Sequence, residues 1–201
     1  MNQTIKKPFY KDTRKIIITA LFSAIASILM YIEIPLPFLP PFLKLDISGV
    51  ASLIGTFTLG VVPGVFITLI KNLIHLLSTQ TGGIGELADF IMTSVLCIGM
   101  WIFTNKTKLK HKMLLGSISG ITIIVIIGCI LNKYLLIPFY EKIMPIEAII
   151  SACSSVNPFI GSIDGYILWG VLPFNLLKGI VVISVTLLTY KKLKTLLNLE
   201  V

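Results

Sequence analysis

Long apolar runs, joined by short polar or glycine- and proline-rich connections, fill most of the chain. The first run, Ile16 to Ile32, carries no charge and is long enough to cross a membrane as one helix. Glu33 and the segment IPLPFLPP follow it, with prolines at positions 35, 37, 40 and 41. Because proline cannot continue a helix, we expect a semi-rigid loop there.

The second run, Ile47 to Ser78, is too long for a single crossing at about 1.5 Å of rise per residue. Gly60 and Gly64, with Pro63 between them, offer a turn near its middle. The pattern therefore predicts two helices that are divided at this turn.

Three further helices are expected after the glycine-rich stretch TQTGGIGE. The fourth helix ends near Thr104, and the fifth runs from Met113 to about Ile137, where Pro138 closes it. The sixth runs from Pro173 to Tyr190, because the missing N–H of proline costs nothing in a first turn. In the long connection before it, the stretch MPIEAIISAC fits a short interfacial helix.

Composition agrees with this pattern. Of the 201 residues, 55% are hydrophobic and 13% are charged, whereas about 25% are charged in an ordinary soluble domain. We therefore predict an all-α integral membrane protein, with one transmembrane domain of six helices over residues 1–201. Little of the chain is left for a separate soluble domain.

The net charge of +8 is concentrated in three short segments, which are the tails at about 1–14 and 191–201 and the loop at 105–112. Six crossings place all three on the same side of a membrane. Since basic segments stay in the cytoplasm, the sequence predicts a multi-pass cell-membrane protein with both termini inside. This reading explains the positive charge without a nucleic-acid partner, and it predicts attraction to anionic lipid.

Sequence signatures of catalysis and of metal binding are absent. The chain has no GxxxxGK[ST], HExxH or GxSxG motif, its three cysteines lack ligand spacing, and His75 and His111 stand apart. We expect no enzymatic activity, no metal and no cofactor of its own. A transported solute would draw its energy from a partner or a coupled ion, and proton coupling through His75, Glu86 or Asp89 stays open.

The candidate binding groups are polar side chains near the outer helix ends, because each one is costly in hydrocarbon without a partner or a ligand. Lys178 and Asn175 share a face of the sixth helix, three residues apart. Asn132 adds an amide at a similar depth on the fifth helix, whereas Lys133 is expected to snorkel outward. The alternative is a snorkelling Lys178 beside an asparagine that packs helices.

A second polar cluster joins the third and fourth helices. Lys71 and His75 lie four residues apart on the third helix, and Glu86 and Asp89 open the fourth. A structural Lys–Glu pair between the helices and a role in ligand binding both remain open.

The proline-rich loop brings apolar side chains to the same outer face. Phe38, Leu39 and Phe42 of PFLPPFLKLD could cover a flat ligand, or could simply rest on the bundle.

Small residues mark one face of the first helix, where Ala20 and Ala24 are four residues apart. This spacing lets another helix approach closely, either inside the bundle or from a partner membrane protein.

Taken together, FLPPFLKLDIS, LGVVPG, KNLIHLL, GELADF and PFNLLKG, in this order between Arg14 and Lys191, resemble the riboflavin-specific S component of energy-coupling factor (ECF) transporters. The resemblance implies a six-helix bundle that captures riboflavin near its outer face. It also implies assembly with a transmembrane coupling component, the T component, and with two ATP-binding cassette ATPases that supply the energy.

The resemblance also assigns roles by position. Asn175 and Lys178 would bond the pyrimidine-like edge of the flavin, Asn132 would reach the ligand, and the loop around Leu39 would close over the ring. Ala20 and Ala24 match the motif by which the first helix of this family docks on the coupling component.

Two residues depart from the family pattern. Gly49 stands where we expect an acidic residue, and Asp89 stands where we expect asparagine, which leaves the orientation of Asp46 toward ligand or solvent open. The sequence also leaves open binding of flavin mononucleotide, of another vitamin such as thiamine or biotin, or a role as a stand-alone ion-coupled transporter.

Overall fold

A computed structural model of the chain describes residues 12–40, 43–106, 112–142 and 145–197. Helices make up nearly all of it, and a short antiparallel sheet follows the first helix. In chain order the elements are α1 (Thr13–Met30), β1 (Ile34–Pro35), β2 (Lys44–Leu45), α2 (Gly49–Leu59), α3 (Val61–His75), the 3₁₀ turn η2 (Leu76–Ser78), α4 (Ile84–Lys106), α5 (Lys112–Leu131), the π-helical turn η3 (Asn132–Leu136), α6 (Ile137–Tyr140), α7 (Ile146–Val156), α8 (Ile163–Tyr166), the π-helical turn η4 (Ile167–Val171) and α9 (Leu172–Leu197).

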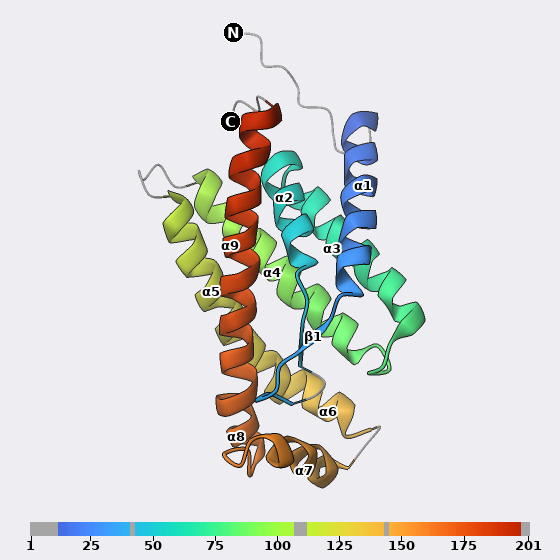
Figure 1. Cartoon of the computed structure of the whole chain (residues 1–201), viewed down its shortest axis with the longest axis vertical. Helices are drawn as coiled ribbons and strands as arrows, with labels where there is room; N and C mark the ends of the chain where they lie inside the picture. The colour runs from blue at the N-terminus through green and yellow to red at the C-terminus, as the bar shows by residue number, and fades with distance from the viewer. Residues whose placement is uncertain (1–11, 41–42, 107–111, 143–144, 198–201) are drawn as a thin grey trace.

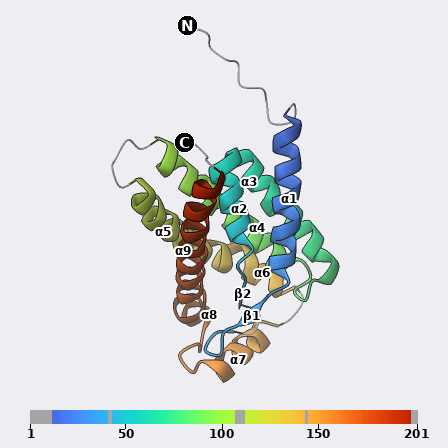
Figure 2. The same ribbon diagram turned by 45° about the horizontal axis from the view of Figure 1, so that its top comes forward.

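The long helices form one bundle with two distinct ends (Figure 1). The start of α1, the end of α4, the start of α5 and the end of α9 lie together at the upper end in this view, which we call the basic end. The hairpin of β1 and β2, together with α6, α7 and α8, lies at the opposite end, which we call the hairpin end (Figures 1 and 2). Within the bundle α1 packs on α2 and α3, while α9 packs on α2 and α5.

Five helical stretches of the described residues are long and apolar enough to cross a membrane: Thr13–Met30, Val61–Ser78, Ile84–Thr104, Lys112–Tyr140 and Ile163–Lys192. The sixth expected span, α2, is apolar but only 11 residues long. The predicted division of the second run is confirmed, because α2 ends at Leu59 and α3 begins at Val61, with Gly60 between them. Gly60 has a φ of 109°, a left-handed conformation that glycine adopts without a steric penalty.

Apolar side chains fill the inside of the bundle and also cover its outside. The main buried cluster joins α2, α4, α5 and α9 through residues that include Leu53, Met100, Ile124 and Val182. Large apolar side chains are exposed on the outer faces, among them Ile17, Leu21, Ile28, Leu77, Leu114, Ile118 and Leu188. A surface of this kind suits hydrocarbon rather than water.

Two prolines do not end or begin helices as expected, and the predicted end at Ile137 and start at Pro173 are both wrong. The fifth helix continues through η3 into α6, past Pro138, and the last helix begins ten residues earlier, at Ile163. Each proline follows a π turn by two residues. In these turns Ile137 N–H donates to Asn132 O, and Leu172 N–H donates to Ile167 O, five residues back. A wider turn accommodates a proline that lacks an N–H and crowds the preceding turn.

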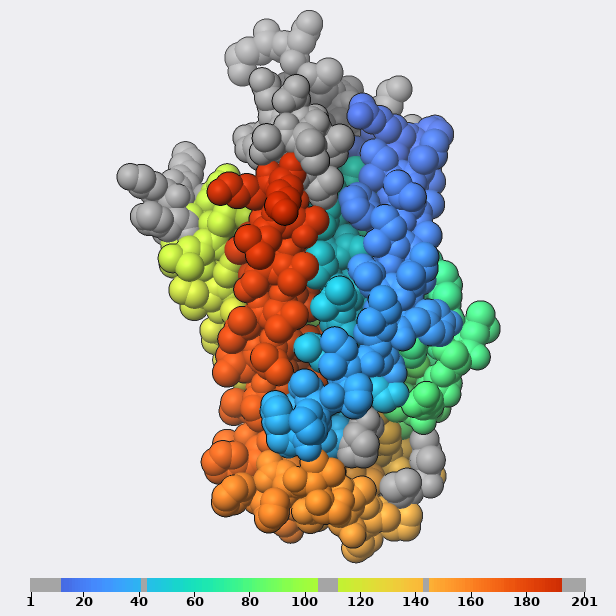
Figure 3. Space-filling model, viewed as in Figure 1, coloured from blue at the N-terminus to red at the C-terminus, as the bar shows by residue number. Residues whose placement is uncertain are grey.

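The hairpin and α7 close the bundle at the hairpin end. Ile34 pairs with Leu45 and Pro35 with Lys44 in the sheet, and this segment lies across the surface between α9 and α1 (Figure 3). The expected short helix is α7, which buries Ile149 and Cys153 in a second cluster with Ile137, Ile160, Tyr166 and Val171. The hairpin end is therefore a packed cap over the ends of the long helices.

Candidate binding site

A large cavity opens at the hairpin end, with a volume of about 500 Å³. This volume lies within the range of about 300–1,000 Å³ that small-molecule sites occupy. The hairpin, the end of α3, the start of α4, η3, α8 and α9 all contribute to its wall. The lining residues are Met30, Tyr31, Glu33, Leu43, Lys44, Asp46, His75, Ser78, Gln80, Thr81, Gly85, Glu86, Ala88, Asp89, Met92, Asn132, Leu136, Tyr140, Tyr166, Phe174, Asn175 and Lys178.

Asn132 and Asn175 present two amides to this cavity from facing helices. Each uses one N–H on the carbonyl four residues earlier, at 2.8 Å for Asn132 to Gly128 and 2.9 Å for Asn175 to Val171. Asn132 Oδ1 also accepts a bond of 3.1 Å from the hydroxyl of Tyr166. Since an amide nitrogen has two N–H groups, each asparagine keeps one donor for a ligand. No described residue donates to Asn175 Oδ1, so Asn175 offers an acceptor as well.

Lys178 is held between two carboxylates at the cavity wall. Its Nζ lies 2.7 Å from Asp46 Oδ2 and 2.8 Å from Asp89 Oδ1, and its side chain is 17% exposed. Since an ammonium group has three donors, one N–H remains for a ligand. The alternative of a lysine that snorkels outward is therefore wrong for Lys178. Lys133 does point outward, where it pairs with Asp164 at 2.7 Å.

Asp46 faces the cavity and not the solvent outside, which settles the orientation that the sequence left open. Its carboxylate also accepts a bond from Ser48 N–H at 3.0 Å and a shorter one from the Ser48 hydroxyl. Burial works to raise the pKa of Asp46, but the ammonium groups of Lys178 and Lys71 outweigh it and hold the pKa below its ordinary value.

Lys71 lies behind this wall and does not line the cavity. Its side chain is 0% exposed, and its Nζ lies 2.6 Å from Asp89 Oδ2 and 2.5 Å from Ser48 Oγ. Asn72 donates a further bond of 3.0 Å to Asp89. The structural pairing of the third and fourth helices is thus present, with Asp89 and not Glu86 as the partner of Lys71. Asp89 connects a fully buried lysine to one that faces the cavity.

His75 and Glu86 also line the cavity. His75 Nδ1 lies 2.8 Å from Glu86 Oε1, and the Tyr31 ring packs on the imidazole with ring centroids 5.1 Å apart. Glu86 also accepts bonds from the hydroxyls of Thr79, at 3.0 Å, and Thr81, at 3.2 Å. Within the described part of the chain, no group of three His, Cys, Asp or Glu side chains is placed to hold a metal ion.

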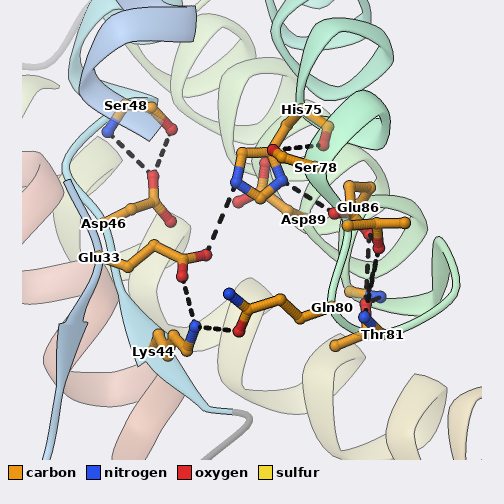
Figure 4. Close-up of polar contacts among 12 residues, drawn as sticks. Glu33, Lys44, Asp46, Ser48, His75, Ser78, Gln80, Thr81, Glu86 and Asp89 are labelled. Carbon is orange, nitrogen blue, oxygen red and sulfur yellow. Dashed lines mark hydrogen bonds and ion pairs between the residues drawn. The ribbon is translucent and has the colours of Figure 1, made fainter. Parts of the chain in front are cut away.

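A polar bridge crosses the rim between the hairpin and the turn that leads into α4 (Figure 4). Lys44 Nζ lies 2.6 Å from Glu33 Oε2 and 2.8 Å from Gln80 Oε1. Glu33 Oε1 lies 3.7 Å from His75 Nε2. We call Glu33, Lys44 and Gln80 the rim bridge, because it ties the hairpin to the far side of the cavity.

Aromatic and apolar side chains supply the rest of the lining, chiefly Met92, Leu136, Tyr140, Tyr166 and Phe174. The cavity thus combines flat apolar walls with a few polar groups of fixed direction, as sites for small aromatic ligands do.

The sequence-predicted residues divide into three groups. Asn132, Asn175, Lys178, Asp46, His75 and Glu86 line the cavity. Leu39 is buried but does not line it, and the same holds for Lys71; Phe42 lies outside the described residues. Sequence reasoning missed Tyr166 because it assigned residue 166 to a loop, and it missed the rim bridge because its residues are far apart in the chain.

The first helix presents its two small residues outward. Thr19, Ser23, Ala26, Ser27 and Met30 are the buried residues of α1. Ala20 and Ala24 are exposed on its other face. Packing of this pair inside the bundle, one of the two alternatives, is therefore wrong.

Comparison with known proteins identifies related chains. Residues 14–190 match the family model described as ECF transporter, substrate-specific component. A solved structure of the S component of a bacterial ECF transporter superposes with a TM-score of 0.74 at 31% identity, and covers 92% of this chain and 98% of that one.

Curated relatives carry transporter names. The riboflavin transporter RibU of Staphylococcus aureus (strain TCH60) is 35% identical over 189 residues, which is 94% of each chain. The riboflavin transporter FmnP of Bacillus subtilis (strain 168) is 27% identical over 184 residues, 90% of this chain and 92% of that protein. RibU of Streptococcus thermophilus is 29% identical over 192 residues, 94% of this chain and 87% of that protein.

Proposed function

This chain belongs to the family of substrate-specific components of ECF transporters, and from that premise we propose that it is a riboflavin-binding membrane subunit. It captures the vitamin at the hairpin end and releases it to the cytoplasm when coupled to its partners. It has no catalytic role and needs no cofactor of its own.

The cavity at the hairpin end is the observation that carries this proposal. A flavin has a flat ring system with an apolar end, an edge of alternating donors and acceptors, and a polyhydroxyl tail. The aromatic lining suits the ring, and the free groups of Asn132, Asn175 and Lys178 offer donors and an acceptor to the edge. The carboxylates and hydroxyls near the rim suit a tail of hydroxyl groups.

The topology we propose has six crossings with both termini in the cytoplasm of a cell-membrane protein. The short helix α2 would make the sixth crossing. The basic end carries Arg14, Lys15, Lys112, Lys191 and Lys192, so the positive-inside rule supports a cytoplasmic basic end. The cavity then faces the outside of the cell.

The partners we propose are a T component and two ABC ATPases. No ATP-binding motif is present in this chain, so transport driven by ATP would need another subunit. The exposed small residues Ala20 and Ala24 on α1 support this face as the contact with the T component, since they let a second helix approach closely.

The test is a binding measurement on the detergent-purified chain. We expect the absorption spectrum of a co-purified flavin, and quenching of riboflavin fluorescence on titration. Asn175→Ala should weaken binding, while Asn157→Ala, which removes an amide outside the cavity, should leave it unchanged. A colourless protein that does not quench riboflavin would overturn the assignment and favour thiamine or biotin. Uptake into vesicles that lack the ATPases, driven by an ion gradient, would overturn the role as a subunit.

A further inference from the structure

We propose that Lys71 and Ser48, neither of which lines the cavity, are positioning residues that keep one N–H of Lys178 free for the ligand. The inference rests on the proposed function, since it concerns how a residue that would bind the flavin is held. It extends the binding site to two buried residues behind the cavity wall.

Five side chains form a closed hydrogen-bonded network at this wall. Lys178 Nζ contacts Asp46 Oδ2 at 2.7 Å and Asp89 Oδ1 at 2.8 Å. Lys71 Nζ contacts the other oxygen of Asp89 at 2.6 Å and Ser48 Oγ at 2.5 Å. The hydroxyl of Ser48 donates to Asp46 Oδ1 and so completes the circuit. We call these five residues the closed network.

The charges of the closed network balance, with two ammonium groups and two carboxylates. Asp46 and Ser48 lie just before α2, and the other three members lie on α3, α4 and α9. Lys71, Ser48 and both carboxylates are buried. Opposite charges attract each other strongly in a buried site, so removal of one charge alters the hold on the rest.

Lys71 and Ser48 determine how the two carboxylates face Lys178. Asp46 Oδ1 accepts bonds from the backbone N–H of Ser48, at 3.0 Å, and from its hydroxyl (Figure 4). Asp89 Oδ2 accepts from Lys71 and from Asn72. Each carboxylate therefore turns only its other oxygen to Lys178. Since an ammonium group has three donors, the third N–H of Lys178 stays available to a ligand.

Ser48 could instead serve the start of α2, because it is the N-cap residue of that helix. A serine at this position ordinarily accepts a bond from a backbone N–H of the first turn. The side chain of Ser48 makes no such bond. Its hydroxyl lies between Asp46 and Lys71, so it serves the closed network and not the helix end.

Loss of the Lys71 charge would free Asp89 Oδ2 from its cation. In the described part of the chain, Lys178 is the other ammonium group that contacts this carboxylate. Two carboxylates would then share one ammonium group, and the third N–H of Lys178 would turn toward Asp89. The ligand would lose a hydrogen bond from a charged donor, although no residue that lines the cavity had been replaced.

The experiment is a double-mutant cycle on the detergent-purified full chain, measured by quenching of riboflavin fluorescence. Lys71→Met should weaken riboflavin binding about tenfold, as for one lost hydrogen bond from a charged donor. In a Lys178→Met background the same substitution should weaken it less than about twofold, because the donor that Lys71 protects is already gone. Equal losses in the two backgrounds would overturn the inference, since a general effect on the fold does not depend on Lys178.

The absorption spectrum of bound riboflavin gives a second readout. The flavin absorption bands respond to hydrogen bonds and charge at the edge of the ring system. The spectrum of riboflavin bound to Lys71→Met should therefore resemble that of riboflavin bound to Lys178→Met. A spectrum identical to that of the natural protein would overturn the inference, because the contact with Lys178 would then be intact.

Ser48→Ala retains every charge, so it decides the question if either lysine variant fails to fold. It removes one of two donors to Asp46 Oδ1 and the acceptor of Lys71, and should weaken riboflavin binding about threefold. The matched control is Ser52→Ala, one helical turn further along α2. Ser52 is also buried and does not line the cavity, and its hydroxyl has no hydrogen-bond partner among the described residues.

Riboflavin affinity should therefore be unchanged in Ser52→Ala. Unchanged affinity in Ser48→Ala, or an equal loss in Ser52→Ala, would overturn the inference and leave the proposed function standing. Failure of riboflavin to bind the natural protein would instead remove the proposed function.

Discussion

The carboxylate of Asp89 lies 2.6 Å from the ammonium group of Lys71, whose side chain has 0% exposure. The other oxygen of the same carboxylate holds Lys178 at the cavity wall, at 2.8 Å. A charge buried without a partner is strongly destabilising, so Lys71 depends on Asp89 for its place inside the bundle. Asp89 therefore links the stability of the fold to the geometry of the site.

Asp89→Asn is predicted to destabilise the protein by about 3 to 5 kcal/mol, the usual cost of leaving a buried charge unpaired. The double variant Lys71→Met/Asp89→Asn removes one charge of each sign and leaves Lys178 its partner Asp46, so it should recover much of that loss. Thermal unfolding of the ligand-free purified protein measures the stability of the single and of the double variant. If the double variant is no more stable than Asp89→Asn, the unpaired charge of Lys71 is not the cause of the lost stability.

Gly128 is predicted to be needed for the position of Asn175. A β-carbon at Gly128 would lie 2.7 Å from Asn175 Nδ2 and 2.9 Å from Met92 Cε, which is closer than real side chains approach. Gly128→Ala should therefore shift Asn175 and weaken riboflavin binding about tenfold, as for one lost hydrogen bond. In Gly161→Ala the new β-carbon has nothing within 4 Å, so that variant should bind normally. Fluorescence titrations of the two variants make the comparison, and equal affinities would contradict the prediction.

Much of the helical framework was predictable because it follows from apolar length and from glycine. The break at Gly60 could be predicted, because a turn between two helices favours a residue that tolerates a positive φ. The course of the helices through Pro138 and Pro173 could not be predicted. A π turn before each proline lets the helix continue, and sequence alone does not indicate a π turn.

The site was only partly predictable for a related reason. Asn132, Asn175 and Lys178 stand out because polar groups are rare within apolar runs. Helical spacing indicates which face a residue occupies but not how deep it lies, and so it did not show that Lys71 sits behind the wall. The rim bridge pairs Lys44 with Gln80, 36 positions away, and only the folded chain brings them together.

The ion pair of Asp46 with Lys178 is predicted to be insensitive to mild acid. Because the folded pKa of Asp46 lies below its unfolded value, the pair stabilises the fold fully above the unfolded pKa, and this contribution is lost as pH falls through the folded pKa. The difference in unfolding temperature between the natural protein and Asp46→Asn should stay constant from about pH 8 to about pH 5, and shrink below about pH 4. A difference that already disappears near neutral pH would contradict the lowered pKa.

The rim bridge is predicted to slow the release of ligand. Lys44 and Glu33 are 26% and 30% exposed, and pairs of this kind contribute about 0.2 to 1 kcal/mol. Lys44→Met should therefore speed riboflavin dissociation by up to about fivefold, as measured by stopped-flow fluorescence. Lys133→Met breaks a comparable pair, with Asp164 at 2.7 Å, away from the cavity and should leave the rate unchanged. If riboflavin dissociates at the same rate from both variants, the rim bridge does not slow its release.

Ala24→Leu tests the outward face of α1 separately from the cavity. Ala24 is exposed, and its neighbours Ala20 and Leu21 are exposed too, so a larger side chain there meets no part of the described bundle. Folding and riboflavin affinity should stay as they are. Close approach of a second helix should be blocked, so co-purification with the T component and ATP-dependent uptake should both be lost.

Ala152→Leu makes the same substitution on the exposed face of α7, at the hairpin end of the molecule. It should preserve both assembly and uptake, because α7 lies away from the α1 face. If Ala24→Leu assembles normally, the T component docks elsewhere on the chain. If both variants lose assembly, added bulk at any exposed alanine is harmful, and α1 has no special role. Loss of assembly in Ala24→Leu alone, with riboflavin affinity intact, assigns α1 to the partner and the hairpin end to the ligand.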